Sequence, residues 1–213
     1  MGESDGVWCF FAQPPASLRF YPDSLNWRKL PFQLWSQIDH PGTWGVRSGK
    51  SRYAQTLAMT AKDVAFLATA QPSDDEMRAK IARHREERPA HWETVEVPLA
   101  LDTAIAEQGS RFSFLLIDCL TTFTANLMAE GDDSEKLMAR VDRVCSAIQV
   151  TPASVALVSN EVGSGVVPAF PSGRQFRDLL GEVNQKFARI SDNVILMIAG
   201  CPVVIKGLAE VRR

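Results

Sequence analysis

One stretch of the sequence has the residue types and order of a loop that binds phosphate groups: Gly45-Val46-Arg47-Ser48-Gly49-Lys50-Ser51. Backbone N–H groups in such a loop, and at the start of the helix that follows it, form a site for anions. Gly49 lets the backbone approach the phosphates, Lys50 reaches the terminal phosphates, and the Ser51 hydroxyl takes a magnesium ligand position. The full pattern has glycine five residues before Gly49, where this chain has Trp44. The sequence therefore predicts a nucleotide site with one departure from the pattern.

A carboxylate stands where such a site needs one. Asp118 ends the strongest aliphatic run of the chain, residues 112–118. An acid at the end of such a strand holds magnesium or its water opposite the loop serine. An acid after an aliphatic run is common and by itself more often structural. Its combination with Gly49-Lys50-Ser51 favours the metal interpretation.

A histidine is the second candidate for chemistry. Met77, Ile81 and His84 fall on one stripe of an expected helix, which places His84 at the rim of the face turned to the core. The basic residues around it are Lys80, Arg83, Arg85 and Arg88. Positive charge lowers the pKa of an imidazole and attracts phosphate, and both suit a neutral nitrogen that attacks phosphorus. A half-buried structural histidine beside a solvated basic face explains the same residues, so both interpretations stay open.

The elements that must position these residues alternate between strands and helices from residue 45 onward. We expect helices over 51–61, 73–87, 99–108, 121–129, 137–148 and 176–190. We expect strands over 64–68, 94–97, 112–118, 154–159 and 193–198, with an edge strand at 203–206. Ser73 and Glu76 have the spacing of a capping box, with Ser73 as the N-cap. This alternation predicts a single α/β domain over 45–213, with a mostly parallel sheet covered by helices on both faces.

Residues 1–44 differ from the rest because tryptophans and prolines recur and no strand or helix period persists. The residues before the loop, 36–43, do not form the aliphatic run of a central strand. The segment is either a partly ordered extension or foreign sequence that replaces the first strand through a frameshift or misplaced start. We favour the second interpretation because the strand and the first glycine are lost at one point. We then expect the neighbours of the lost strand to have unpaired backbone groups.

Composition excludes several classes of function. The 213-residue chain has a net charge of -2 and no apolar run long enough to span a membrane, so neither nucleic acid nor a bilayer is an expected partner. Its four cysteines are scattered, which is typical of reduced thiols in a cytoplasmic protein.

Several motifs together resemble one family, the bifunctional adenosylcobinamide kinase / adenosylcobinamide-phosphate guanylyltransferases of cobalamin biosynthesis. The resemblance covers about residues 45–206 and keeps the family's order and spacing. Besides Gly45 to Ser51, the motifs are Asp75-Glu76-Met77, His84-Arg85-x-x-Arg88-Pro89, Asp118-Cys119-Leu120-Thr121, Ser159-Asn160-Glu161-Val162-Gly163, Phe176-Arg177-Asp178 and Val183-Asn184-Gln185.

The resemblance implies a P-loop NTPase-like fold and a two-step transferase. ATP or GTP phosphorylates adenosylcobinamide, and GTP then gives GMP to a histidine, from which it passes to adenosylcobinamide phosphate. His84 matches the guanylylated histidine, so His84 and Lys50 are the expected catalytic residues, and Ser51 and Asp118 are the expected ligands of Mg²⁺. The expected nucleotide contacts are Gly45, Val46, Arg47, Ser48, Gly49, Lys50, Ser51, Thr69, Ala70, Gln71, Arg85, Glu86, Glu87, Arg88, Glu96 and Asp118. Family members form homo-oligomers, typically trimers with sites between subunits, so a homotrimer or another homo-oligomer is expected.

The departure at the N-terminus affects the expected activity. A tryptophan at position 44 places a large side chain where backbone must approach phosphate, so we expect weakened nucleotide binding and impaired activity. Two alternatives remain beside the bifunctional transferase. One is a different P-loop small-molecule kinase with a structural His84, and the other is a non-catalytic nucleotide-binding relic.

Overall fold

Three aliphatic runs form the centre of the sheet: β4 (Val64–Ala68), β6 (Phe114–Asp118) and β7 (Ser154–Val158). A strand covered on both faces has apolar residues at almost every position, and these runs are buried almost throughout. The computed structural model describes residues 4–5, 9–12, 38–39, 48–72, 74–86, 88–163 and 165–207.

In this described part of the chain, seven strands form one sheet in the order β5-β4-β6-β7-β2-β8-β9. β5 (Glu93–Glu96) pairs parallel with β4, and β4, β6 and β7 pair parallel in turn. β8 (Asn193–Ile198) runs in the direction of β7, because β2 (Cys9–Ala12) pairs antiparallel with both. The edge strand β9 (Cys201–Lys206) pairs antiparallel with β8. The expected mostly parallel sheet is confirmed.

The N-terminal segment supplies a central strand, and the expectation that its neighbours lack a partner is wrong. β2 lies between β7 and β8, where Cys9 pairs with Val158 and Phe11 with both Ala156 and Asn193. β2 is antiparallel, so its first residue lies at the carboxyl edge of the parallel strands. The end of β2 and the corner that follows the phosphate loop therefore lie at opposite edges of the sheet. Among the strands described, β3 (Ile38–Asp39) comes last before that loop, and it pairs with β1 (Ser4–Asp5) in a separate two-stranded sheet.

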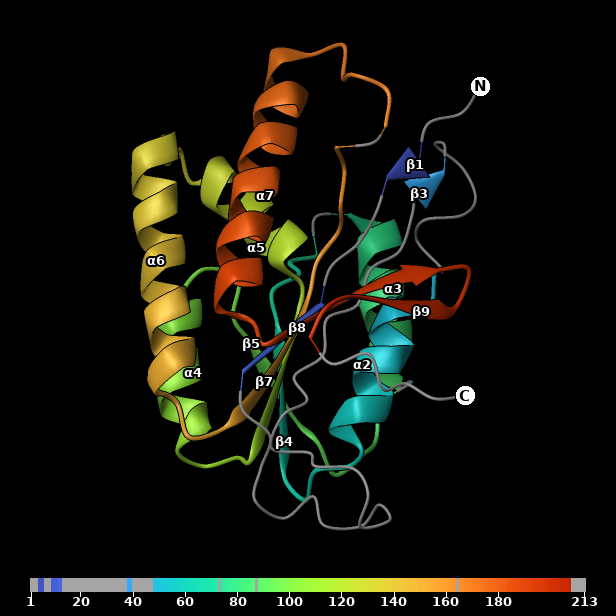
Figure 1. The fold of residues 1–213 in the computed structure, drawn as a ribbon, viewed down its shortest axis with the longest axis vertical. Coiled ribbons are helices and arrows are strands. Elements are labelled where there is room, and N and C mark those ends of the chain that lie inside the picture. The colour runs from blue at the N-terminus through green and yellow to red at the C-terminus, as the bar shows by residue number, and fades with distance from the viewer. Residues whose placement is uncertain are drawn as a thin grey trace.

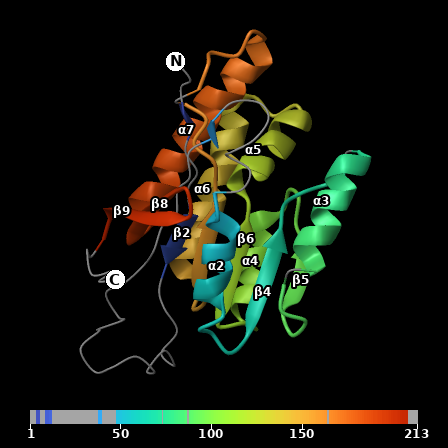
Figure 2. The same ribbon diagram turned by 90° about the vertical axis from the view of Figure 1, so that its right-hand side faces the viewer.

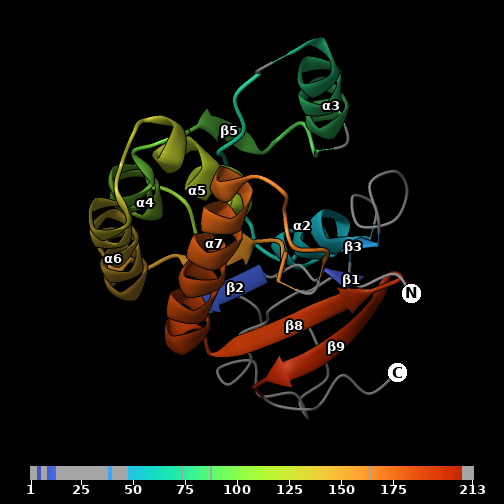
Figure 3. The same ribbon diagram turned by 90° about the horizontal axis from the view of Figure 1, so that it is seen from above.

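The helices cover both faces of the sheet (Figure 1). One face is packed by α4 (Leu101–Gly109), α5 (Leu120–Ala129), α6 (Ser134–Val150) and α7 (Pro171–Ile190). On the other side lie α2 (Lys50–Ala58) and α3 (Asp75–Glu86), as the view from above shows (Figure 3).

Successive side chains of each central strand point to opposite faces, and this alternation divides the core in two. Leu115 and Ile117 of β6 pack among the four helices, whereas Phe114 and Leu116 pack in the second core with Ala54 and Ala58 of α2. The sheet thus joins two hydrophobic cores, and its carboxyl edge is held from both sides.

Some boundaries differ from those expected. The N-cap of α3 is Asp74, not Ser73: Met77 donates its backbone N–H to Asp74 Oδ1 at 2.7 Å. Ser73 lies outside the described residues, as does Glu87 at the expected end of the helix. α7 begins at Pro171, five residues before the expected start, because proline is favourable in the first turn of a helix. None of the helices described is both long and apolar enough to cross a bilayer.

Candidate active site

The corner between the phosphate loop and α2 is held by a turn near the other end of the chain. Gly49 has φ +87°, in the left-handed region that favours glycine, and a Cβ atom there would lie 3.5 Å from Gly200 Cα. Gly200 donates its backbone N–H to the Ser48 carbonyl at 3.1 Å. Among the described residues no side chain caps α2, which leaves the first N–H groups of this helix for an anion.

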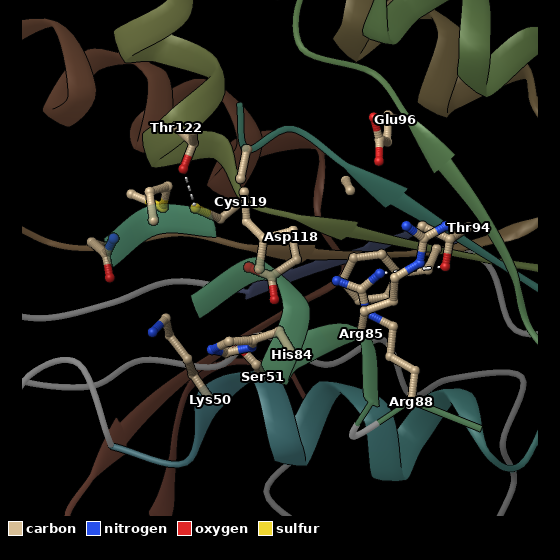
Figure 4. Close-up of a pocket in the computed structure, with 16 residues that line it drawn as sticks. Lys50, Ser51, His84, Arg85, Arg88, Thr94, Glu96, Asp118, Cys119 and Thr122 are labelled. Carbon is tan, nitrogen blue, oxygen red and sulfur yellow. Dashed lines mark hydrogen bonds between the residues drawn. The ribbon is translucent and has the colours of Figure 1, made fainter. Parts of the chain in front are cut away.

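A pocket of about 210 Å³ opens next to this corner, at the carboxyl edge of β4, β5, β6 and β7. Figure 4 shows Ser51 and His84 close together below Asp118, with Lys50 beside them. The lining residues are Lys50, Ser51, Phe66, Ala68, Ala70, Met77, Ile81, His84, Arg85, Arg88, Thr94, Glu96, Asp118, Cys119, Thr122 and Asn160. The structure therefore brings the lysine, the serine, the acid and the histidine together, although they come from separate elements.

The apolar stripe of α3 faces the pocket and not the core. Met77 and Ile81 line the pocket together with His84, and neither belongs to a hydrophobic core cluster. None of the described side chains of α3 is buried. The expectation that this stripe turns toward the core is wrong, because a period of 3.6 residues shows that one face is covered but not what covers it.

The acid is fixed by the strands around it. Asp118 ends β6, paired with Ala68 and Val158, and its carbonyl accepts the backbone N–H of Thr69 at 3.2 Å. The next residue, Cys119, donates its backbone N–H to Thr69 Oγ1 at 2.7 Å. Burial raises the pKa of the Cys119 thiol, the negative charge of Asp118 raises it further, and the positive charge of Lys50 lowers it. Both charges thus act at the same point of the pocket wall.

Arg88 brings positive charge to the other end of the pocket. Its guanidinium carbon lies 3.5 Å from the centre of the Phe66 ring, and Nη1 donates to Thr94 Oγ1 at 3.3 Å. Partial burial lowers the pKa of Arg88, an effect that Asp118 and Glu96 oppose. An arginine remains charged despite such a shift. The pocket thus holds a planar cation stacked on an aromatic ring, beside two carboxylates.

The structure gathers half of the expected site residues directly. Lys50, Ser51, Ala70, His84, Arg85, Arg88, Glu96 and Asp118 line the pocket. Ser48 and Gly49 form the corner beside it. Gly45, Val46, Arg47 and Glu87 lie outside the described residues.

Three expected nucleotide contacts do not line the pocket. Gln71 and Glu86 are exposed, and Thr69 is fully buried. The Thr69 hydroxyl accepts from the backbone N–H of Cys119 and donates to its carbonyl at 2.8 Å. Thr69 therefore joins the ends of β4 and β6.

The site residues expected from the sequence did not include other lining residues, among them Thr94, Thr122 and Asn160, although Asn160 belongs to one of the motifs that carry the family resemblance. Asn160 follows β7, at the carboxyl edge of the parallel strands, where ligands bind, whereas Thr94 is the second residue of β5 and pairs with Phe66 in the middle of β4. That rule could have identified Asn160 once the strands were placed. Thr122 lies in the first turn of α5 after Asp118, and its hydroxyl lies 3.1 Å from the Cys119 sulfur.

The loop-to-helix corner at the carboxyl edge of the sheet, with an acid ending a nearby strand, defines an α/β protein of P-loop NTPase-like architecture. Residues 43–205 match the family described as cobinamide kinase / cobinamide phosphate guanyltransferase. The chain belongs to this family.

Curated relatives agree with this assignment. The chain is similar to the bifunctional adenosylcobalamin biosynthesis protein CobU of Salmonella typhimurium, with 42% identity over 176 residues, which cover 77% of this chain and 97% of the relative. The Escherichia coli protein of the same name is 40% identical over the same shares of both chains. The bifunctional adenosylcobalamin biosynthesis protein CobP of Pseudomonas aeruginosa is 40% identical over 164 residues, which cover 76% of this chain and 94% of the relative.

Proposed function

We propose that this protein is a bifunctional transferase that phosphorylates adenosylcobinamide with ATP or GTP and then converts the product to adenosylcobinamide-GDP with GTP. One observation carries the proposal: His84 lines the same pocket as Lys50, Ser51 and Asp118. A phosphate-binding corner alone would suit any small-molecule kinase. A histidine facing the same space adds a nucleophile that can accept a nucleotidyl group.

In the first step, the hydroxyl oxygen of the aminopropanol group attacks the terminal phosphorus of the nucleotide. The bond from that phosphorus to the bridging oxygen breaks, the nucleoside diphosphate leaves, and the hydroxyl proton passes to water. Lys50 and the N–H groups at the start of α2 stabilise the charge on the phosphate oxygens. Catalysis of this step consists mainly of positioning and charge stabilisation.

In the second step, a neutral ring nitrogen of His84 attacks the α-phosphorus of GTP. A nitrogen–phosphorus bond forms, the bond to the bridging oxygen breaks, and pyrophosphate leaves. A phosphate oxygen of the phosphorylated corrinoid then attacks the same phosphorus, and the nitrogen–phosphorus bond breaks. Arg85 and Arg88 line the pocket next to His84 and provide positive charge for the phosphates of both substrates.

The pocket fits a magnesium ion held largely by its substrates. Ser51 and Asp118 both line it with oxygen donors, and in the described part of the chain no three His, Cys, Asp or Glu residues form a metal cluster. Mg²⁺ commonly takes one or two protein ligands and completes its shell with phosphates and water. Ser51 and Asp118 would hold it, and the ion would neutralise charge on the transferred phosphate.

The proposal extends to the assembly and its location. We expect a cytoplasmic homo-oligomer, in keeping with the trimer implied by the family resemblance. Multi-angle light scattering of the full chain measures the oligomeric state, and a monomer at micromolar concentration would contradict this part of the proposal.

Covalent labelling with GTP radiolabelled at the α-phosphate tests the function. The full chain should take up label in an acid-labile form, and His84→Ala should abolish the uptake. His91→Ala is the matched control, because His91 is exposed and does not line the pocket. Adenosylcobinamide should chase the label from the protein once ATP has phosphorylated it. Label that persists in His84→Ala would overturn the proposed role of this histidine.

A further inference from the structure

A chain of polar groups connects α7, the end of β7 and α5 behind the pocket. Ser159 Oγ donates to Asn184 Oδ1 at 2.7 Å, and Asn184 Nδ2 donates to the Asn160 carbonyl at 2.9 Å. The backbone N–H of Asn160 and its side-chain Nδ2 both donate to Thr121 Oγ1 at 2.8 Å. The four residues form one continuous network in the order Ser159, Asn184, Asn160 and Thr121, and Asn160 is its member that lines the pocket.

The network occupies space that apolar side chains would otherwise fill. Ser159 is 0% and Asn184 1% exposed, and Asn184 lies on the face of α7 that also buries Val183 and Phe187. Burying polar groups costs free energy unless hydrogen bonds compensate. A fully connected buried network fixes one arrangement of its members. Its effect here is to hold both the backbone and the side chain of Asn160.

The sheet order places Asn160 at the phosphate end of the pocket. Glu96 ends β5 at one side of the row of strands, followed by the ends of β4 and β6, and Asn160 follows β7 at the other side. α2 packs on β6 and β7, so Lys50 and Ser51 at its start lie on the side of Asn160. Along the sheet, Asn160 therefore lies on the far side of Asp118 from Glu96, which is the side where α2 begins.

The hydrogen bonds of Asn160 determine which chemical group it can bind. Nδ2 donates to Thr121, and no hydrogen bond among the described residues uses Oδ1. A carbonyl oxygen accepts hydrogen bonds, and so do the oxygens of an ionised phosphate. Oδ1 is thus complementary to a hydroxyl group and not to the phosphates.

We propose that Asn160 contacts the substrate in the phosphorylation step and orients the attacking hydroxyl, whose proton donates a hydrogen bond to Oδ1. This inference rests on the proposed function, in which an aminopropanol hydroxyl attacks the terminal phosphorus. Asn160 takes no proton in the reaction. Thr121 and Asn184 are positioning residues, which act by fixing the amide of Asn160.

The two steps of the reaction provide the test, because a hydroxyl group attacks only in the first. The rate of phosphorylation of adenosylcobinamide and the rate of His84 labelling from GTP are measured in the full chain. Asn160→Ala should lower kcat for phosphorylation about 100-fold, the size expected when a reacting group loses its orientation. The KM for ATP and the labelling rate should stay within about threefold of the unchanged chain, because neither involves the hydroxyl.

A pair of substitutions at Thr121 tests the positioning role. Thr121→Val removes the hydroxyl but keeps the shape and should lower kcat for phosphorylation about tenfold, whereas Thr121→Ser keeps the hydroxyl and should stay within about twofold. Thr124→Val is the matched control: Thr124 is buried in the same helix, and within the described part of the chain its hydroxyl bonds only to the Leu120 carbonyl. If Asn160→Ala does not fold, the Thr121 pair decides the question.

Each result separates the two proposals. Equal losses in phosphorylation and labelling, or equal kinetics for Thr121→Val and Thr121→Ser, would overturn the role of Asn160 while the proposed function stands. An unchanged chain that labels at His84 but does not phosphorylate would overturn the kinase half and this inference with it. A chain that does neither would overturn the proposed function itself.

Discussion

The two walls of the pocket are built from different elements: Figure 2 shows α2 lying against the sheet and α3 set apart beside β4 and β5. The sheet wall consists of the start of α2 and the ends of β4, β6 and β7, and it carries Lys50 and Asp118. The helix wall is α3, and it carries His84. α2 buries Ala54, Gln55 and Ala58, whereas α3 buries none of its described side chains. The groups that stabilise charge are thus fixed by two cores, and the proposed nucleophile sits on a helix none of whose described side chains is buried.

The largest expected effect comes from removing charge on the sheet wall. Lys50→Ala should lower the phosphorylation rate about 1000-fold, because it removes a preorganised positive charge from the phosphates. Arg85→Ala, on the helix wall, should lower the same rate only about tenfold, because Arg85 is exposed and solvent screens its charge. Steady-state kinetics of both variants measures the difference. Equal losses would show that the two walls contribute alike.

Stability should show the same contrast with one matched substitution. Ile117→Ala in β6 should lower the free energy of unfolding by about 2–5 kcal/mol, because Ile117 is fully buried in the larger core. Ile81→Ala in α3 should cost less than about 1 kcal/mol, because that side chain is only half-buried at the pocket. Urea denaturation of both variants provides the values. A cost at Ile81 as large as that at Ile117 would contradict the picture of a loosely held helix.

Hydrogen exchange tests the contrast without a substitution. Backbone amides of α3 should exchange at least about 100-fold faster than those of β6, because segments with little buried apolar surface open at a lower free energy. Mass spectrometry after proteolysis resolves peptides from both elements. Addition of GTP should slow exchange in α3 if His84 and its neighbours contact the nucleotide. Equal protection of the two walls in the free protein would remove the distinction.

The smallest expected effect concerns the departure from the phosphate-loop pattern. Trp44→Gly should tighten GTP binding about tenfold, because glycine permits the close backbone approach that a tryptophan hinders. Replacing residues 1–44 by an aliphatic strand that ends in glycine should have at least this effect. Calorimetric titration with GTP compares both with the unchanged chain. If the unchanged chain already binds GTP as tightly as the variants, Trp44 does not impair the loop.

The sequence was sufficient to predict the strands that are covered by protein on both faces. β4, β6 and β7 are covered on both faces, so their residues are apolar at nearly every position and the strands could be located directly. Lys50, Ser51 and Asp118 followed from their spacing, because the phosphate corner and the end of the neighbouring strand are set by local geometry. Their roles in catalysis remain predictions, and the Lys50→Ala variant tests that of Lys50.

The features that could not be predicted depend on contacts between segments far apart in the sequence. Cys9-Phe10-Phe11-Ala12 is too short to show a strand period, and it forms β2 through its pairing with β7 and β8. The side of α3 that faces the pocket could not be distinguished from a side that faces the core. Asn160 is a single polar residue after a strand, and its place in the pocket depends on Thr121 and Asn184, which come from two other helices.

The hydrogen bond between Gly200 and Ser48 has a consequence for the order in which the molecule is made. The corner that would receive a nucleotide's phosphates is supported by a turn that is synthesised after α2, α3, β6 and β7. A nascent chain that already contains α2, β6 and His84 still lacks this support. The protein should therefore acquire its affinity for nucleotides only when β8 and β9, the strands on either side of this turn, have joined the sheet, and a chain ending before β8 should lack that affinity.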